Sequence, residues 1–245
     1  MSLTASFSDS LAASTGRLSI AVLPVENLSG SKAPMKEIGQ LVTAELKRQG
    51  LDIIDVSILE EFMARHRLRY TGAVDTEISL AFGKETGAEA VLITSLELYD
   101  ERYPPRAALI SRLVSVGETP VILWMDSTGL SGDDTPGILG LGLVEEPRRL
   151  LEKAVHTLLS SLSMQLSGGE QTVSSLKRKR LRPKSFYRSP VLSSGMKYKI
   201  AVMPFLNRSE RKNAGDIMML HLVDRLRRVE NFDVIEPGIV RDDLL

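Results

Sequence analysis

The sequence IAVLPVEN at residues 20–27 is nearly repeated as IAVMPFLN at residues 200–207, and the architecture can be inferred outward from these two places. In both places apolar residues occupy successive positions, which is typical of a strand that is covered on both faces. Pro24 lacks a backbone N–H and cannot donate to a sheet, so the first strand should end near it. The sequence therefore predicts a short buried strand at the first stretch, and the second stretch repeats its pattern.

A helix and a second strand are predicted to follow the first of these stretches, after a loop at residues 26–34. Residues 35–50 place Ile38, Leu41, Val42 and Leu46 on one helical face, and Gly50 can adopt the left-handed conformation that ends a helix. Residues 51–56, LDIIDV, form the second strand. A strand, a helix and a strand in this order predict a parallel pair.

The pattern then continues to a complete domain. Ser57 and Glu60 fit a capping box that opens a helix, and Asp75 or Thr76 can cap the next helix, which should stop at Gly87. The remaining elements are a strand at 88–99, an antiparallel hairpin of 106–116 and 119–129, and a helix at 145–162 with the buried stripe Leu151, Val155, Leu158, Leu159 and Leu162. The fold class is α/β with α+β character, in which helices pack on a mixed sheet in two layers.

The repeated stretch also has a repeated continuation. When residues 45–63 are laid against 225–245, Leu46 falls on Leu226, Arg48 on Arg228, Asp52 on Asp233 and Ile54 on Ile235. Helix, turn, strand and next helix recur in one order, which indicates an internal duplication. The alternative is a pair of unrelated strand–helix units with similar propensities.

These observations divide the chain into four parts. They are a flexible lead-in at 1–16, a complete α/β domain at 17–162, a basic linker at 163–197 and an incomplete second copy at 198–245. The second copy lacks a third strand, a hairpin and a closing helix, and so short a segment buries too little apolar surface to fold securely alone. We expect it either to continue in a longer tandem array, which we favour, or to be completed by another surface.

Charge is balanced over the chain but unevenly distributed. Lys+Arg and Asp+Glu each total 31, yet residues 177–188, KRKRLRPKSFYR, hold seven basic residues and no acidic one. The remainder of the chain is therefore mildly acidic, and basic residues confined to one short segment argue against a folded DNA-binding face. The segment could bind an anionic membrane surface or RNA, with Phe186 and Tyr187 stacking on bases, but a solvated linker extended by charge repulsion is favoured.

No residue cluster predicts catalysis. The chain has no cysteine, and His66, His156 and His221 lie far apart, so each is expected on a helix surface rather than on a metal. No nucleophile elbow, Walker A or HExxH motif is present. The sequence therefore predicts no catalytic, cofactor-binding or metal-binding residue, and no cofactor.

Several weaker features have structural explanations. Gly140 and Gly142 are expected in a turn before the last helix rather than in a dinucleotide loop. Asp133-Asp134 should be solvated and cap a backbone turn, Glu145-Glu146 should lie at a helix N-terminus, and Trp124 should belong to the core or an interface. No apolar run approaches the ~20 residues that a membrane-spanning helix needs, and residues 1–17 do not form a signal peptide.

The order of these elements resembles a family of bacterial envelope lipoproteins. The family includes the curli-secretion protein, the penicillin-binding-protein activators and the TolB N-terminal-like α/β domain. The residues that carry the resemblance are 20–27 with Ser29, Gly87-Ala88 with 91–94, and 200–207 with Ser209. The resemblance covers residues 17–162 and 197–245.

The resemblance implies a non-catalytic, periplasmic, outer-membrane-associated module that works through protein contacts or assembly and is anchored by an N-terminal lipid. Its partners would be other envelope proteins or further copies of itself. This chain lacks the lipid-bearing cysteine and the membrane-spanning hairpins of the curli pore, and its tandem copy differs from the single-domain activators. Two other functions remain open from the residues alone: a nucleic-acid-binding module that uses the basic linker, and an enzyme with an unrecognised pocket.

Overall fold

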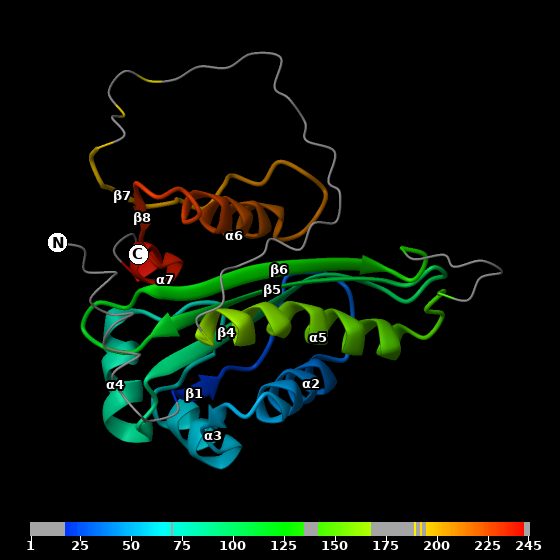
Figure 1. The fold of residues 1–245 in the computed structure, drawn as a ribbon, viewed down its shortest axis with the longest axis horizontal. Helices are drawn as coiled ribbons and strands as arrows, with labels where there is room; N and C mark the ends of the chain where they lie inside the picture. Colours follow the sequence, from blue (N-terminus) through cyan, green and yellow to red (C-terminus); the bar gives the residue numbers. More distant parts are fainter. Residues whose placement is uncertain are drawn as a thin grey trace.

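The computed structural model describes residues 18–69, 71–134, 142–167, 189, 192 and 195–242 (Figure 1). The first part contains β1 (Ser19–Val22), β2 (Glu26–Asn27), α2 (Met35–Arg48), β3 (Asp52–Ile53), α3 (Val56–Arg65), α4 (Thr76–Thr86), β4 (Ala90–Asp100), β5 (Arg106–Ser115), β6 (Ile122–Ser131) and α5 (Pro147–Leu166). The C-terminal unit, residues 198–242, contains β7 (Tyr198–Ile200), α6 (Ala214–Leu226), β8 (Phe232–Val234) and α7 (Pro237–Asp242).

The main sheet is mixed and has the order β3-β1-β4-β5-β6. β1 runs parallel to β3 and β4, while β4, β5 and β6 are antiparallel, so the predicted parallel pair and the predicted hairpin are confirmed. One prediction was wrong in detail. Residues 26–34 do not form a loop throughout, because β2 pairs with β4 beyond the end of β1.

Helices cover both faces of this sheet, so the two-layer prediction was wrong. Ile20 points into a core with α2 and α5, whereas the adjacent Ala21 points into a second core with α3 and α4. Successive residues of a strand face opposite sides, so strands with continuous apolar runs need cover on both sides. In Figure 1, α2 and α5 lie beneath the sheet.

Helix ends follow local chemistry. Asp55, not Ser57, caps α3, because its carboxylate accepts the Ser57 backbone N–H at 2.8 Å and the capping-box prediction was therefore wrong. Asp75 caps α4 as predicted, and Gly50 and Gly87 take positive φ values of 78° and 71° at the ends of α2 and α4. α5 continues to Leu166, four residues beyond its predicted end, and its predicted apolar stripe is buried.

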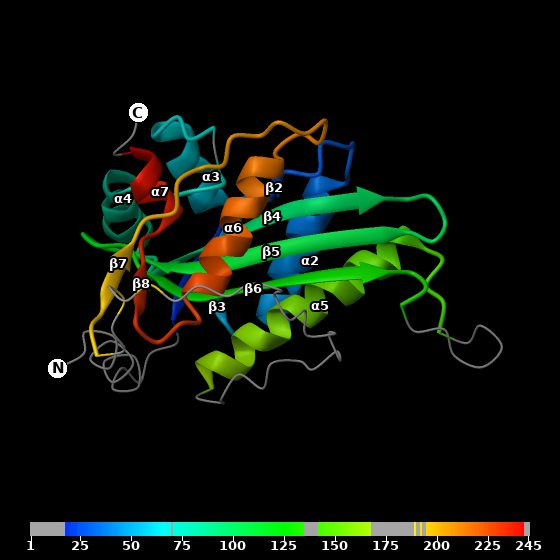
Figure 2. The same ribbon diagram turned by 90° about the horizontal axis from the view of Figure 1, so that it is seen from above.

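The C-terminal unit lies on the sheet face opposite α5, with α6 crossing β5 and β6 (Figures 1 and 2). Its strand pair has the same register as the first pair: Ile20 lies opposite Ile53, and Ile200 lies opposite Val234. The next backbone bond is also equivalent, because the N–H of Ile54 donates to Ile20 and that of Ile235 donates to Ile200, each at 2.9 Å.

The turn after each repeated stretch is equivalent as well. The Asn27 side chain accepts the N–H and hydroxyl of Ser29 at 3.1 and 2.7 Å. The Asn207 side chain accepts the same two groups of Ser209 at 2.9 and 2.8 Å. Asparagine is favoured in such turns because its side chain bonds to the backbone two residues further on.

Candidate functional site

The first candidate site is the docking face, which we define as the contact between the C-terminal unit and the side of β4, β5 and β6 opposite α5. Its apolar part is a buried cluster, and none of its members is more than 9% exposed: Leu28, Ile110, Met125, Val202, Ile217, Leu220, Val223 and Val234. Burying apolar surface contributes about 25 cal/mol per Å², so this cluster supplies the main attraction between the two parts.

An ion pair is buried at one end of the docking face. Arg112 of β5 and Glu236, just before α7, are 2% and 0% exposed. The Arg112 Nε lies 3.1 Å from both carboxylate oxygens of Glu236, and its Nη2 lies 2.9 Å from one of them. The same Nη2 donates to the Gly72 carbonyl at 2.6 Å. With charge and donors satisfied together, the pair ties β5, the 71–75 loop and the C-terminal unit into one contact.

Backbone packing adjoins this pair. Gly238, at the start of α7, lies against the loop, and a Cβ at that position would approach the Val74 carbonyl oxygen to 2.3 Å. Only a residue without a side chain allows α7 to lie this close to the loop.

Polar groups surround the remainder of the docking face. Arg211 donates to the Glu97 carbonyl at 2.8 Å, and Arg227 donates to the carbonyls of Ile122 and Leu123 at 3.2 and 3.3 Å. His221 lies 3.0 Å from the carboxylate of Glu97, which is nearly buried. The hydrogen bond to Glu97 raises the pKa of His221, and burial lowers the pKa of Arg227.

The second candidate site is the outer face of the C-terminal unit, defined by Met203, Phe205, Leu206, Met218 and Leu222. These side chains are exposed by 37–79%. Four of them match buried positions of the first unit: Leu23, Val25, Ile38 and Val42, which are at most 9% exposed. The reason is that α6 turns Ile217, Leu220 and Val223 toward the sheet, which leaves Met218 and Leu222 outside.

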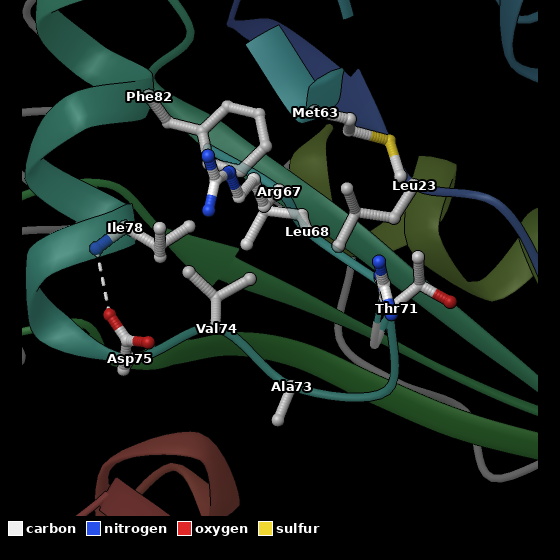
Figure 3. A pocket seen from close by; sticks show the side chains of 11 residues that line it. Leu23, Met63, Arg67, Leu68, Thr71, Ala73, Val74, Asp75, Ile78 and Phe82 are labelled. Carbon is white, nitrogen blue, oxygen red and sulfur yellow. Dashed lines mark hydrogen bonds between the residues drawn. The ribbon is translucent and has the colours of Figure 1, made fainter. Parts of the chain in front are cut away.

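A third candidate is a pocket of about 320 Å³ between α3, α4 and the end of β1 (Figure 3). Its walls are mainly apolar: Leu23, Met63, Leu68, Val74, Ile78 and Phe82. Arg67, Arg69, Thr71 and Asp75 add polar groups. The Asp75 carboxylate accepts the Ile78 N–H at 2.7 Å and so caps α4; this hydrogen bond is the dashed line in Figure 3. The arginines are the charged groups of the lining for which the described residues supply no ion pair.

The three histidines lie apart, each beside one carboxylate. His66 lies 2.7 Å from Glu85, His156 lies 3.0 Å from Glu45, and His221 lies against Glu97. Within the described ranges, no group of three or more His, Cys, Asp or Glu side chains is arranged to hold a metal ion. Over the same ranges, no helix is both long and apolar enough to cross a membrane.

The weaker sequence features are placed as follows. The Asp134 carboxylate accepts the Ser131 backbone N–H at 2.7 Å, which confirms its role in a turn, and Glu146 lies at the N-terminus of α5. Trp124 is buried in the core, where its indole N–H donates to Ser161 at 3.2 Å, as expected. Gly140 and the basic segment 177–188 lie outside the described residues, as does the lead-in 1–16.

Sequence reasoning missed the ion pair in the docking face. Arg112 is the one charged residue in the mainly apolar run ALISRLVSV, and a charged residue in the middle of a buried strand is a signal that it must have a partner. The partner could not be identified in the same way, because Glu236 lies 124 residues further along the chain.

No protein-family model and no curated protein sequence matches this chain. Solved structures to which this chain shows some similarity include the lipoprotein GNA1162 from Neisseria meningitidis, at 21% identity over 51% of this chain and 89% of that one, with a TM-score of 0.41. Two others are the hypothetical protein CT253 from Chlamydia trachomatis (12% identity, 63% and 100% covered, TM-score 0.43) and the LpoB C-terminal domain from Salmonella enterica (19%, 50% and 90%, TM-score 0.39). At these values the similarities assign neither a family nor a function to the chain.

Proposed function

We propose that this chain is a non-catalytic protein-interaction or assembly module of the bacterial cell envelope, the part of a lipoprotein that lies outside the membrane. It consists of one complete α/β domain and an incomplete second copy, and its binding surface is the outer face of the C-terminal unit. The observation that carries this proposal is the exposure of Met203, Phe205, Met218 and Leu222 at positions whose counterparts in the first unit are buried.

The equivalent geometry of the two units supports the duplication. Both have a parallel strand pair in the same register, the same backbone bond after it and the same asparagine turn. Two unrelated strand–helix units would share a helix and a strand by propensity, but they would share a register and a side-chain-bonded turn only by chance.

Two features support a protein as the partner of the outer face. Five large apolar side chains within residues 203–222 are exposed, and such a concentration of exposed apolar residues commonly marks a protein interface. In the first unit, β1 is paired on both edges, by β3 and β4. Among the described residues, β7 is paired only with β8. An unpaired strand edge next to apolar side chains can accept a further strand.

The proposal is tested by site-specific photocrosslinking in bacteria that express the whole protein with its own leader. A crosslinking amino acid at position 218 or 205 should give protein adducts in the envelope fraction. The control is position 103, because Tyr103 is 66% exposed and belongs to the turn between β4 and β5 rather than to the C-terminal unit. Adducts at all three positions, or at none, would contradict the proposed surface. A whole protein that is cytoplasmic and carries no lipid would contradict the envelope assignment.

A further inference from the structure

The pocket beside α3 has the composition of a binding site for an amphiphile. Leu23, Val74 and Phe82 are at most 3% exposed and form its base, while Met63, Leu68 and Ile78 form partly buried walls. Its volume of about 320 Å³ lies at the lower end of the ~300–1,000 Å³ range of ligand pockets. Such a volume suits a short aliphatic chain better than a nucleotide or a peptide.

The lining of the pocket carries more positive than negative charge, because Arg67 and Arg69 stand against the single carboxylate of Asp75. Arg67 and Arg69 line the pocket with exposed side chains, and neither has an ion pair within the part of the chain that the structure describes. The neighbouring basic side chains are already engaged, because Arg65 pairs with Glu61 and Glu85, and His66 lies against Glu85. The two free guanidinium groups therefore favour an anion at the pocket.

Arg67 occupies a backbone position at the end of α3 that normally favours glycine. Arg67 has a φ of 53°, in the left-handed region, where the chain leaves α3. The N–H of Leu68 bonds to the Met63 carbonyl at 2.9 Å and that of Arg67 bonds to Ala64 at 3.3 Å, a pattern that normally places glycine at this position.

Two other helices show the expected glycine. α2 and α4 are followed by Gly50 and Gly87, which have the same left-handed conformation. Arg67 thus occupies a conformation that L side chains rarely adopt. Its side chain extends from this turn into the pocket lining, and in the view of Figure 3 its guanidinium projects over Phe82 and Ile78.

We propose that this pocket binds an aliphatic chain that carries an anionic oxygen head group, either a carboxylate or a phosphate. The chain packs against Leu23, Val74 and Phe82, and the head group accepts hydrogen bonds from Arg67 and Arg69. Guanidinium groups bind carboxylate and phosphate oxygens by charge-assisted, often bidentate hydrogen bonds. The inference is separate from the proposed function, since the pocket can hold an amphiphile whether or not the outer face binds a protein.

The test is isothermal titration calorimetry of the full chain with decanoate and decyl phosphate, each kept below its micelle concentration. Decanol supplies the chain without the charge, and inorganic phosphate supplies the charge without the chain. We expect saturable binding of at least one anionic amphiphile, and affinities at least about tenfold lower for decanol and for phosphate. The ratio of the affinities for decanoate and decyl phosphate shows whether the pocket prefers a carboxylate or a phosphate head group. Equal binding of decanol, or no saturable binding of either amphiphile, would overturn the proposal.

Arg67→Gly separates a binding role from a structural one. Glycine fits the left-handed position better, so the variant should unfold at a temperature about 2–4 °C higher, while its affinity for the preferred amphiphile falls at least about fivefold. Arg69→Gln should lower the affinity without this gain. Arg65→Gln is the matched control. Arg65 lies two residues before Arg67 and already pairs with Glu61 and Glu85, so its replacement removes one positive charge but should leave the affinity unchanged. Unchanged affinity in Arg67→Gly would contradict the inference.

Discussion

The β1–α2–β3 unit and the β7–α6–β8 unit begin with nearly the same eight residues and pair their strands in the same register, yet their helices bury different faces. In α2 the stripe Ile38, Val42 and Leu46 is at most 1% exposed. In α6 the matching Met218 and Leu222 are 57% and 37% exposed.

The contrast separates features that one unit determines by itself from features that depend on the surface it meets. Strand pairing and the asparagine turn involve residues of a single unit, and they are the same in both units. The buried helix face depends on the surface that is present. α2 packs into a core with β4 and α5 on one face of the main sheet, whereas α6 packs against Ile110 and Met125 on the opposite face of the same sheet.

The largest expected effect comes from breaking the contact that holds the second unit in place. Glu236→Ala leaves the Arg112 guanidinium buried without its counter-charge, which should destabilise docking by about 3–5 kcal/mol. Amide hydrogen exchange should then accelerate in α6 and α7 far more than in α2.

A double variant tests the cause of this loss. Arg112→Met combined with Glu236→Leu removes both charges, so it should recover most of the lost protection, because no charge is left buried and unpaired. Equal acceleration in α2 and α6 after Glu236→Ala would show that the two units do not unfold separately.

The next effect compares matched positions on the two helices. Ile38→Ala should lower the free energy of unfolding by about 2–5 kcal/mol, because Ile38 is fully buried and truncation leaves a cavity. Met218→Ala should change it by no more than about 0.5 kcal/mol, since Met218 is largely exposed. Urea unfolding of both variants measures the contrast. Similar losses in both would mean that the outer face is covered within the chain itself.

The sequence predicts the features that depend on neighbouring residues and does not predict those that depend on distant segments. Short sequence patterns predicted four features correctly. They are the parallel β1–β3 pair, the hairpin, the glycines after α2 and α4, and the Asp75 cap. The cap of α3 was misplaced by two residues because Asp55 and Ser57 are both good cap residues.

Features that depend on distant partners could not be predicted in this way. The pairing of β2 with β4 and the Arg112–Glu236 ion pair join residues that are 69 and 124 positions apart. The cover of the sheet by helices on both faces likewise depends on which segments meet in space. The same holds for the pocket and the outer face. The docking face offered one signal in the sequence, because the charged Arg112 in a buried strand required a partner.

A smaller effect tests the shared turn. Asn27→Ala and Asn207→Ala each remove the acceptor for two hydrogen bonds from the following serine, at a cost of about 0.5–1.5 kcal/mol. If the two turns are equivalent, the losses should agree within about 0.5 kcal/mol, as measured by urea unfolding for Asn27 and by hydrogen exchange of α6 for Asn207. Asn27→Asp and Asn207→Asp keep the acceptor oxygen but lose the amide donor to the carbonyls of Ser31 and Arg211. A smaller loss than in the alanine variant would assign the effect to the serine hydrogen bonds, and an equal or larger loss would assign it to the amide donor.

The smallest expected effect concerns pH, and it should belong to the second unit alone. His221 lies at the position of α6 that matches Leu41 of α2, so the first unit has no titrating group there. The hydrogen bond to Glu97 raises the pKa of His221, with Asp224 adding attraction and Arg225 opposing it. A raised pKa means that the stabilisation is fully present below the ordinary histidine value of about 6.5 and is lost as the pH rises through the pKa of the folded state. Because the His221 side chain is 40% exposed, the change should stay below about 1 kcal/mol. Hydrogen exchange of α6, corrected for its intrinsic pH dependence, should therefore show stronger docking at pH 6 than at pH 8. His221→Leu, which installs the residue of the first unit, should abolish that difference, and a difference that persists in this variant would assign it to another group.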